Sequence, residues 1–124
     1  MQKEQLCRVY YQARKLALNN GHDFHVAAFV KRGNCYRFGI NSYRSSAKFK
    51  RIIDGRVECN LHAEMDVLRH ARPGDVIHIM RFTKDGAITM AKPCTICQGF
   101  LKRHGIRMVK YTDWNGEWQK MRIE

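Results

Sequence analysis

Hydrophobic residues recur at different spacings along the chain, and each spacing predicts a different element. From residue 2 to residue 19 they recur every three or four positions, which predicts an amphipathic helix. Two short runs of β-type residues follow, at 24–30 and 35–40, and the polar segment between them contains Gly33. Two such runs around a short glycine-containing turn predict a β-hairpin.

The middle of the chain has no clear hydrophobic period before residue 60. Residues 41–59 are expected to form a polar, basic connection, because five of them are Lys or Arg and only two are acidic. A helix is then expected to begin near Asn60, a residue type that caps helix N-termini, and to end at residues 72–74, Arg-Pro-Gly. The next elements are a strand, a turn and an extended return, at 75–82, 84–86 and 87–91.

The last third of the chain predicts one more helix and a final pair of strands. The helix is expected to start at Pro93, where a missing N–H is harmless, and to end at Gly105, which suits a left-handed cap. Residues 107–112 and 117–123 are β-type runs around residues 115–116, Asn-Gly, so the last two strands should form an antiparallel hairpin. The order of elements predicts an α/β fold in which helices sandwich a mixed five-stranded sheet.

Length and composition narrow the class of protein. A chain of 124 residues without repeats or linkers is expected to form a single domain spanning 1–124. No apolar run approaches the roughly 20 residues of a membrane span, and the N-terminal residues do not resemble a secretory signal. Five cysteines, an odd number, indicate free thiols and metal ligands in a reducing compartment. We therefore expect a cytoplasmic protein that does not bind a membrane.

The charge of the chain is strongly positive. The formal net charge is +12 and the isoelectric point is about 9.9. Phosphates are the commonest anions that a protein meets, so this excess favours a nucleotide or nucleic acid as partner. A generally basic surface that aids solubility is the alternative interpretation.

Two short motifs carry the candidate chemistry. One is H-x-E at His62 and Glu64, and the other is P-C-x-x-C, which runs from Pro93 through Cys94 to Cys97. The two cysteines are three positions apart, so both sulfurs face the same side of the first helical turn. One histidine and two cysteines make three zinc ligands and leave a position for water, as in catalytic zinc sites. Glu64 is then placed to reach that water without binding the metal and to move its proton.

The two motifs resemble the signature of the cytidine deaminase-like superfamily, which contains zinc-dependent cytidine, deoxycytidylate and polynucleotide deaminases. The resemblance in the order of elements covers nearly the whole chain. It implies hydrolytic deamination of a nucleobase, with Zn²⁺ as cofactor held by His62, Cys94 and Cys97 and with Glu64 as the catalytic residue. Members of this superfamily frequently assemble, so the resemblance also implies a homo-oligomer.

The sequence indicates the target base, and the nucleoside, nucleotide or nucleic acid that contains it, less directly than the metal site. The metal motif suits attack on cytosine and on adenine alike. The antiparallel final strand pair resembles the cytidine deaminase branch, so we expect conversion of cytosine to uracil. The charge favours a phosphate-bearing substrate, with single-stranded DNA or RNA slightly ahead of a nucleotide. A salvage enzyme for free cytidine or dCMP, and a tRNA-type adenosine deaminase, remain alternatives.

Six residues are candidates for substrate contacts. Asn41 ends Gly-Ile-Asn at 39–41, which resembles a family motif whose asparagine contacts sugar or base, and Lys92 directly precedes the Pro-Cys pair, where it can meet a phosphate. Aromatic rings can stack on bases or line the pocket mouth, although burial in the core is the commoner role of a single ring. The full set is Asn41, Ala63 through its backbone, Lys92, Tyr43, Phe82 and Trp114. The five histidines other than His62 lack ligand spacing and receive no functional role.

Cys59 supports a different interpretation of the zinc site. It lies three residues before His62, so it can join His62, Cys94 and Cys97 in a closed Cys₃His site. Such a site would be structural, and the chain would then be a non-catalytic nucleic-acid-binding module. That interpretation leaves Glu64 without a role.

Overall fold

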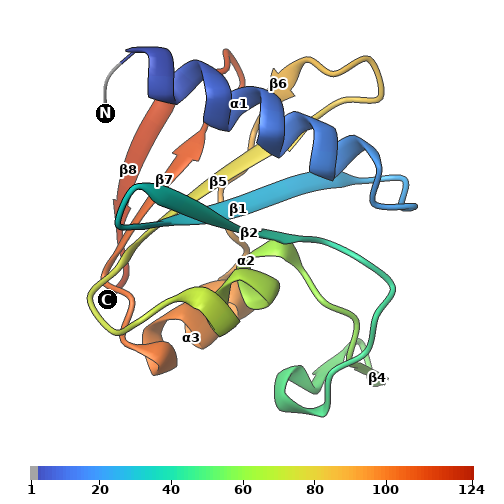
Figure 1. Cartoon of the computed structure of the whole chain (residues 1–124). Coiled ribbons are helices and arrows are strands. Elements are labelled where there is room, and N and C mark those ends of the chain that lie inside the picture. Colours follow the sequence, from blue (N-terminus) through green and yellow to red (C-terminus); the bar gives the residue numbers. More distant parts are fainter. Residues whose placement is uncertain (1–2) are drawn as a thin grey trace.

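A mixed β-sheet forms the centre of the computed structural model, with one helix on one face and two helices on the other (Figure 1). The structure describes residues 3–124, and it describes side chains within the first helix from residue 8 onward. The helices and strands are α1 (Lys3–Leu18), β1 (His25–Arg32), β2 (Cys35–Ile40), the 3₁₀ helix η1 (Ala47–Phe49), β3 (Arg51–Ile53), β4 (Arg56–Glu58), α2 (Ala63–Asp66), the 3₁₀ helix η2 (Val67–His70), β5 (Val76–Phe82), β6 (Ile88–Thr89), α3 (Thr95–His104), β7 (Met108–Thr112) and β8 (Trp118–Arg122).

The order of the strands is β2-β1-β5-β7-β8, and the two-residue strand β6 pairs with the end of β5. Strands β5 and β7 are parallel, whereas the other pairs in the sheet are antiparallel. The predicted mixed α/β sheet is therefore confirmed. The last two strands form the antiparallel hairpin that the Asn-Gly pair predicts.

Each face of the sheet carries its own hydrophobic core. Side chains along a strand point to opposite faces in turn, so Ile77 and Ile79 of β5 pack under α2 and α3. Met80 and Phe82 of the same strand pack with α1 in the second core. In α1 that second core contains residues four positions apart, Val9, Ala13 and Ala17. The predicted first helix is thus confirmed, although residue 2 lies outside the described residues.

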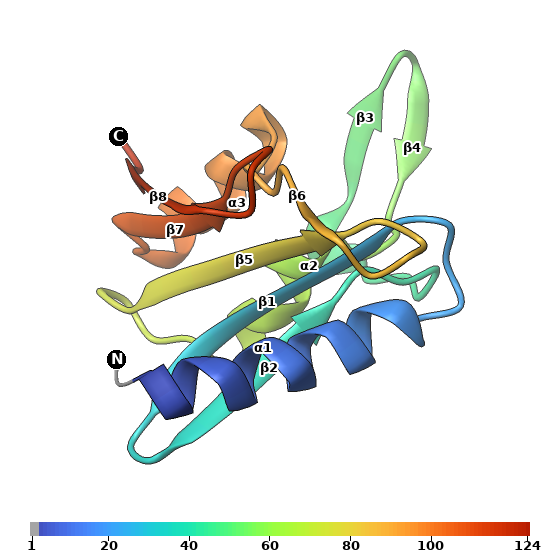
Figure 2. The same ribbon diagram turned by 90° about the horizontal axis from the view of Figure 1, so that it is seen from above.

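The basic segment 41–59 contains more structure than a connection. It forms η1 and a small hairpin of β3 and β4, which projects away from the central sheet (Figure 2). The turn consists of Asp54 and Gly55, both with positive φ (50° and 79°), as a tight hairpin turn requires. The Asp-Gly pair between short apolar runs is a sequence signal for this hairpin.

The second and third helices start later than their sequence signals predict. His62, rather than Asn60, is the N-cap of α2, because Asn60 forms a β-bridge with Ser45. Instead of the single helix predicted to run to residues 72–74, one short α-helix tightens into η2 and ends at His70. In α3 the N-cap is Cys94 rather than a residue before Pro93, while Gly105 ends the helix in the left-handed conformation, as predicted.

Close contact between β2 and α2 sets the position of α2. Gly39 lies so near α2 that a Cβ atom there would be 2.8 Å from the Ala63 carbonyl oxygen and would overlap the Val67 backbone nitrogen. The Ile40 N–H also donates a 3.0 Å hydrogen bond to the Asp66 carboxylate. None of the helices in the described part of the chain has the length and apolar character needed to cross a membrane.

Candidate active site

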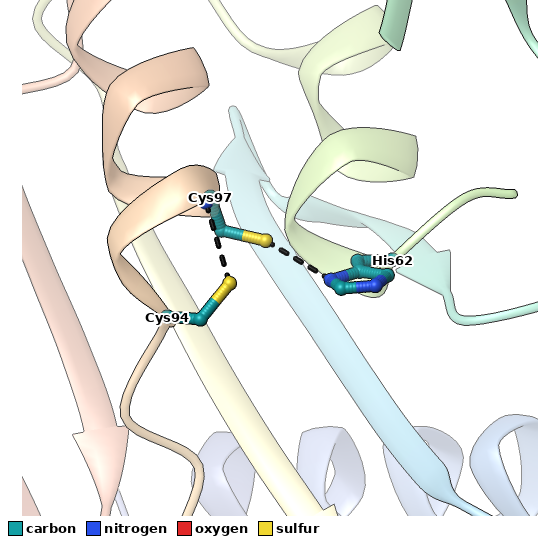
Figure 3. A group of neighbouring side chains, drawn as sticks. All are labelled: His62, Cys94 and Cys97. Atoms are coloured by element: carbon teal, nitrogen blue, oxygen red, sulfur yellow. Dashed lines mark hydrogen bonds between the residues drawn. The ribbon is translucent and has the colours of Figure 1, made fainter. Parts of the chain in front are cut away.

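The two sequence motifs meet where α2 and α3 begin. His62 is the N-cap of α2, Cys94 is the N-cap of α3, and Cys97 lies in the first turn of α3. Figure 3 shows the three side chains pointing toward one another. The Nδ1 atom of His62 lies 3.2 Å from the Cys97 sulfur, and the Cys97 N–H donates to the Cys94 sulfur at 3.4 Å.

These three side chains form a group that can hold a metal ion. One donor atom from each of His62, Cys94 and Cys97 lies within 4.8 Å of the other two. One nitrogen and two sulfurs are ligands that suit Zn²⁺. Among the described residues, Cys59 does not belong to this group, so the geometry does not support the closed Cys₃His site.

Cys94 is the more acidic of the two cysteines. Hydrogen bonding, in the first place from Cys97, lowers the pKa of Cys94 to about 3, which favours the thiolate form of this sulfur. The hydrogen bond to that thiolate, together with burial, raises the pKa of Cys97. The same thiolate raises the pKa of His62, although burial opposes the shift. A thiolate at the start of a helix is also stabilised by the positive end of the helix dipole.

Glu64 lies on the first turn of α2, next to the metal-binding group. Its side chain is buried, with an exposed fraction of 8% for the residue. Burial raises the pKa of its carboxyl group, and the charge on His62 opposes this shift. A buried carboxyl group beside a reactive centre is suited to accept and return a proton.

His62, Glu64 and Cys94 line one cavity of about 400 Å³. Three of the predicted substrate contacts, Asn41, Ala63 and Lys92, also line it. The remaining lining residues are His22, Phe24, Val26, Asn60, Leu61, Arg81, Met90 and Ala91. The structure thus brings the catalytic and metal-binding candidates together with half of the predicted substrate contacts.

Asn41 is held by hydrogen bonds within the cavity wall. Its side-chain oxygen accepts from the Val26 N–H at 2.9 Å and from the Asn20 side chain at 2.7 Å. Its side-chain nitrogen donates to the Phe24 carbonyl at 3.0 Å. The amide nitrogen carries two protons, so one N–H is left without a partner among the described residues.

Tyr43, Phe82 and Trp114 are not among the residues that line the cavity. Phe82 is buried at 2% exposure on the α1 face, because strand alternation points it away from α2 and α3. Trp114 is 72% exposed in the final hairpin turn. Tyr43 is 66% exposed and stacks on His22, which does line the cavity, with 4.3 Å between ring centroids.

Eight lining residues were not predicted from the sequence, and His22, Phe24 and Arg81 are the ones among them with an aromatic or basic side chain. Arg81 has a sequence signal, because it continues the alternation of Ile77 and Ile79 on the face toward α2 and α3. His22 and Phe24 lie in the loop between α1 and β1 and have no such period.

Solved structures of two deaminases share the fold of this chain. A cytidine deaminase from Burkholderia pseudomallei matches with a TM-score of 0.62 and 21% identity, over 99% of this chain and 94% of that chain. A dCMP deaminase from the cyanophage S-TIM5, solved in complex with dCMP and dUMP, gives a TM-score of 0.59 and 18% identity, over 92% of this chain and 85% of that chain. No family model and no curated protein matches the sequence. The chain has the cytidine deaminase-like fold, as its two motifs predict.

Proposed function

We propose that this chain is a zinc-dependent hydrolytic deaminase that converts cytosine to uracil in a phosphate-bearing substrate. The observation that carries the proposal is the meeting of His62, Cys94 and Glu64 at one cavity, with Cys97 completing the metal-binding group. The solved neighbours act on cytidine and dCMP, which supports cytosine as the base. A reducing cell interior suits the thiolate ligands, so the cytoplasmic location stays part of the proposal.

His62, Cys94 and Cys97 are the residues that would hold the zinc ion. When bound, zinc supplies Lewis acidity that lowers the pKa of water to about 7. The lowered pKa of Cys94 favours the deprotonated form that a zinc ligand requires. The first turn of α3 keeps both sulfurs on the same side, so little rearrangement is needed for the pair to bind.

Glu64 moves the protons of the reaction. Water adds through its oxygen to C4 of cytosine while Glu64 accepts one water proton and delivers it to the ring nitrogen N3. The C4–N4 bond then breaks, a second proton reaches the leaving amine through Glu64, and ammonia and uracil result. The enclosure of Glu64 in the cavity wall limits the competing exchange of these protons with bulk water.

Other residues of the wall would orient the base and its sugar. The unused N–H of Asn41 would donate to the substrate, while its other bonds hold Phe24 and Val26 in the wall. The backbone of Ala63 would contact the base. Tyr43 remains a proposed contact through its stack on His22, and Trp114 remains one only for a substrate long enough to reach the final hairpin.

A strand of nucleic acid is the slightly favoured carrier of the cytosine. A second groove, between η1 and α3, is lined by the positive side chains of Lys48, Lys50 and Arg103. Phe100 lines the same groove, with the Arg103 guanidinium 4.5 Å from its ring centre. Positive charge interleaved with aromatic rings suits a single strand of phosphates and bases. The solved dCMP deaminase supports a mononucleotide instead.

The test of the proposal uses Glu64→Gln in zinc-loaded protein. We expect its turnover to fall by about 10²–10⁴-fold, because the amide cannot carry the proton. Uracil release is measured from cytidine, dCMP, single-stranded DNA, double-stranded DNA and RNA, and inosine release from RNA tests the adenosine alternative. Glu117→Gln, an exposed carboxyl group in the final hairpin, is the matched control. A Glu64→Gln protein with full zinc content and wild-type turnover would overturn the mechanism.

A further inference from the structure

We propose that Arg81 and Lys92 form a phosphate-binding site at the rim of the catalytic cavity. Arg81 carries the larger part of this role, and neither the sequence motifs nor the fold assigns it one. The inference rests on the proposed function and deepens it, because it assigns residues that distinguish a phosphorylated cytosine substrate from a bare nucleoside.

The register of the sheet brings the two cations to the same wall. Arg81 lies near the end of β5, where it pairs with Val26 of β1 on one side and with Thr89 of β6 on the other. Lys92 follows Thr89 by three residues, which span about 10 Å of extended chain. Val26, Arg81 and Lys92 all line the cavity.

Phe24 holds the Arg81 side chain at the mouth of the cavity. The guanidinium carbon of Arg81 lies 5.3 Å from the centre of the Phe24 ring, a cation–π contact. Phe24 is 56% exposed as a residue, so the guanidinium in contact with it lies toward the solvent side of the wall. A guanidinium that stacks through its face keeps the N–H groups of its edge free for an oxyanion.

No acidic side chain at the rim neutralises these charges. Glu64 is the only carboxylate among the described residues that line the cavity, and it is buried beside the metal-binding group. The ion pairs in the described part of the chain involve other residues and leave Arg81 and Lys92 out. Two cations on one cavity wall, with no carboxylate beside them, attract an anion. A phosphate is such an anion, and it accepts hydrogen bonds from arginine in a bidentate geometry.

The proton carrier lies deep in the cavity and the cations lie at its opening, as the base and the phosphate of a bound nucleotide require. The proton carrier Glu64 is buried, whereas Lys92 and Phe24 are exposed. A base that reaches Glu64 therefore directs its sugar and phosphate outward, toward the rim. The cavity of about 400 Å³ has room for a base and sugar, and the phosphate lies at its opening.

The experiment compares substrates that differ only in the phosphate. The kcat/KM of zinc-loaded protein is measured with deoxycytidine and with dCMP for the wild type, Arg81→Met, Arg81→Lys and Lys92→Met. We expect Arg81→Met to lower kcat/KM for dCMP by about 10–100-fold and for deoxycytidine by less than about twofold. Arg81→Lys should keep part of the dCMP activity. Arg107→Met removes the same charge from an exposed position away from the cavity and should change neither value.

Three results would overturn the phosphate site. An equal loss on deoxycytidine and dCMP would show that Arg81 only shapes the wall through Phe24. An unchanged kcat/KM for dCMP in both Arg81→Met and Lys92→Met would show that neither residue meets the phosphate. An equal effect of Arg107→Met would assign the loss to net charge.

Binding separates this inference from the proposed function. Titration calorimetry with dUMP and with deoxyuridine measures the phosphate contribution without turnover. If zinc-loaded protein deaminates no cytosine substrate, the proposed function fails, while a dUMP affinity that falls selectively in Arg81→Met still supports the site. Equal affinity of wild-type protein for dUMP and deoxyuridine overturns the site.

A third substrate, a five-nucleotide single strand with one central deoxycytidine, identifies whether the bound phosphate belongs to a polynucleotide or to a free nucleotide. Similar losses for this strand and for dCMP in Arg81→Met support binding of the phosphodiester of a polynucleotide. A loss for dCMP alone supports the terminal phosphate of a free nucleotide. Both patterns support the phosphate site and differ in the substrate that they identify.

Discussion

Arg51 lies directly behind His62 and is almost fully buried, with 8% exposure. Its guanidinium donates to the carbonyl oxygens of Phe49 and Asn60, both at 3.0 Å, and to the Asn60 side chain. It also donates to Nε2 of His62 at 3.2 Å, and the Glu58 carboxylate lies 3.9 Å away. Because arginine is only a donor, this contact places the proton of neutral His62 on Nδ1, which faces the Cys97 sulfur and would lose that proton to bind a metal. Arg51 positions His62 through its bonds to Asn60, which lies two residues earlier in the chain.

We therefore expect Arg51→Met to weaken zinc binding by about 10–100-fold, the usual loss when a residue that orients a ligand is removed. Competition with a chromogenic chelator measures the affinity. Arg56→Met, an exposed arginine of the same hairpin, is the control and should bind zinc as the wild type does. Arg51→Lys is a second variant for the case in which Arg51→Met does not fold, because it keeps a buried positive charge and loses the planar group of N–H donors. Wild-type zinc affinity in folded Arg51→Met would contradict the assigned role.

At the scale of elements, the contact between β2 and α2 places two of the candidate functional residues. Gly39 leaves room for the start of α2, which carries Glu64 and follows its N-cap His62. A methyl group at Gly39 meets backbone atoms rather than a flexible side chain, so α2 has to move. The position of α2 thus depends on Gly39 of β2 having no side chain.

Gly39→Ala is expected to lower the free energy of unfolding by about 1–3 kcal/mol, the range for an overpacked core. Zinc affinity should fall with it, because the shift of α2 displaces His62. Urea unfolding measures the stability. Gly99→Ala on α3 adds a methyl group into open space and should raise stability by about 0.5–1 kcal/mol, the gain of alanine over glycine in a helix. Equal stability of Gly39→Ala and the wild type would show that β2 and α2 adapt without strain.

At the scale of the whole molecule, a half-buried histidine couples the fold to pH. His78 lies on the α1 face of β5, with its ring 4.8 Å from Phe29 and 5.5 Å from Trp118 between centroids. Its Nδ1 atom is buried without a hydrogen-bond partner in the described structure. Burial lowers the pKa of His78 to about 4, and the charge on Lys110 adds to the shift.

The sign of the pH effect follows from the proton balance. In the unfolded chain His78 takes up a proton near pH 6.5, whereas the folded protein resists protonation down to about pH 4. The contribution of His78 to the free energy of unfolding is therefore constant above about pH 6.5. As the pH drops from 6.5 toward 4, that free energy falls by up to about 3 kcal/mol. Urea unfolding of wild type and His78→Leu at pH 7.5, 6 and 5 tests this. The variant should lose less stability than the wild type over this range. Equal slopes for the wild type and His78→Leu would contradict the prediction.

The amino-acid sequence by itself determined the elements and the chemical groups of the site. Hydrophobic spacing is local, so it predicts α1, the strands of the central sheet and the final hairpin, whereas β3 and β4 lie in the segment expected to be a connection. The H-x-E and C-x-x-C spacings are also local, and a histidine, two thiols and a carboxyl group are the groups that metal binding and proton transfer need. His62, Glu64, Cys94 and Cys97 can therefore be identified from the order of residues alone.

Only the tertiary structure decided which residues surround that chemistry. The cavity wall joins the loop before β1, the end of β5 and the segment after β6, and these segments meet through strand pairing between residues far apart in the sequence. Local spacing carries no information on such meetings. The alternation along β5 places Arg81 on the face toward α2 and α3 and Phe82 on the other face, but only the folded sheet makes Arg81 part of the cavity wall. The stack of Phe24 on Arg81, and with it the proposed phosphate site, exists only because the folded sheet brings β1 and β5 side by side.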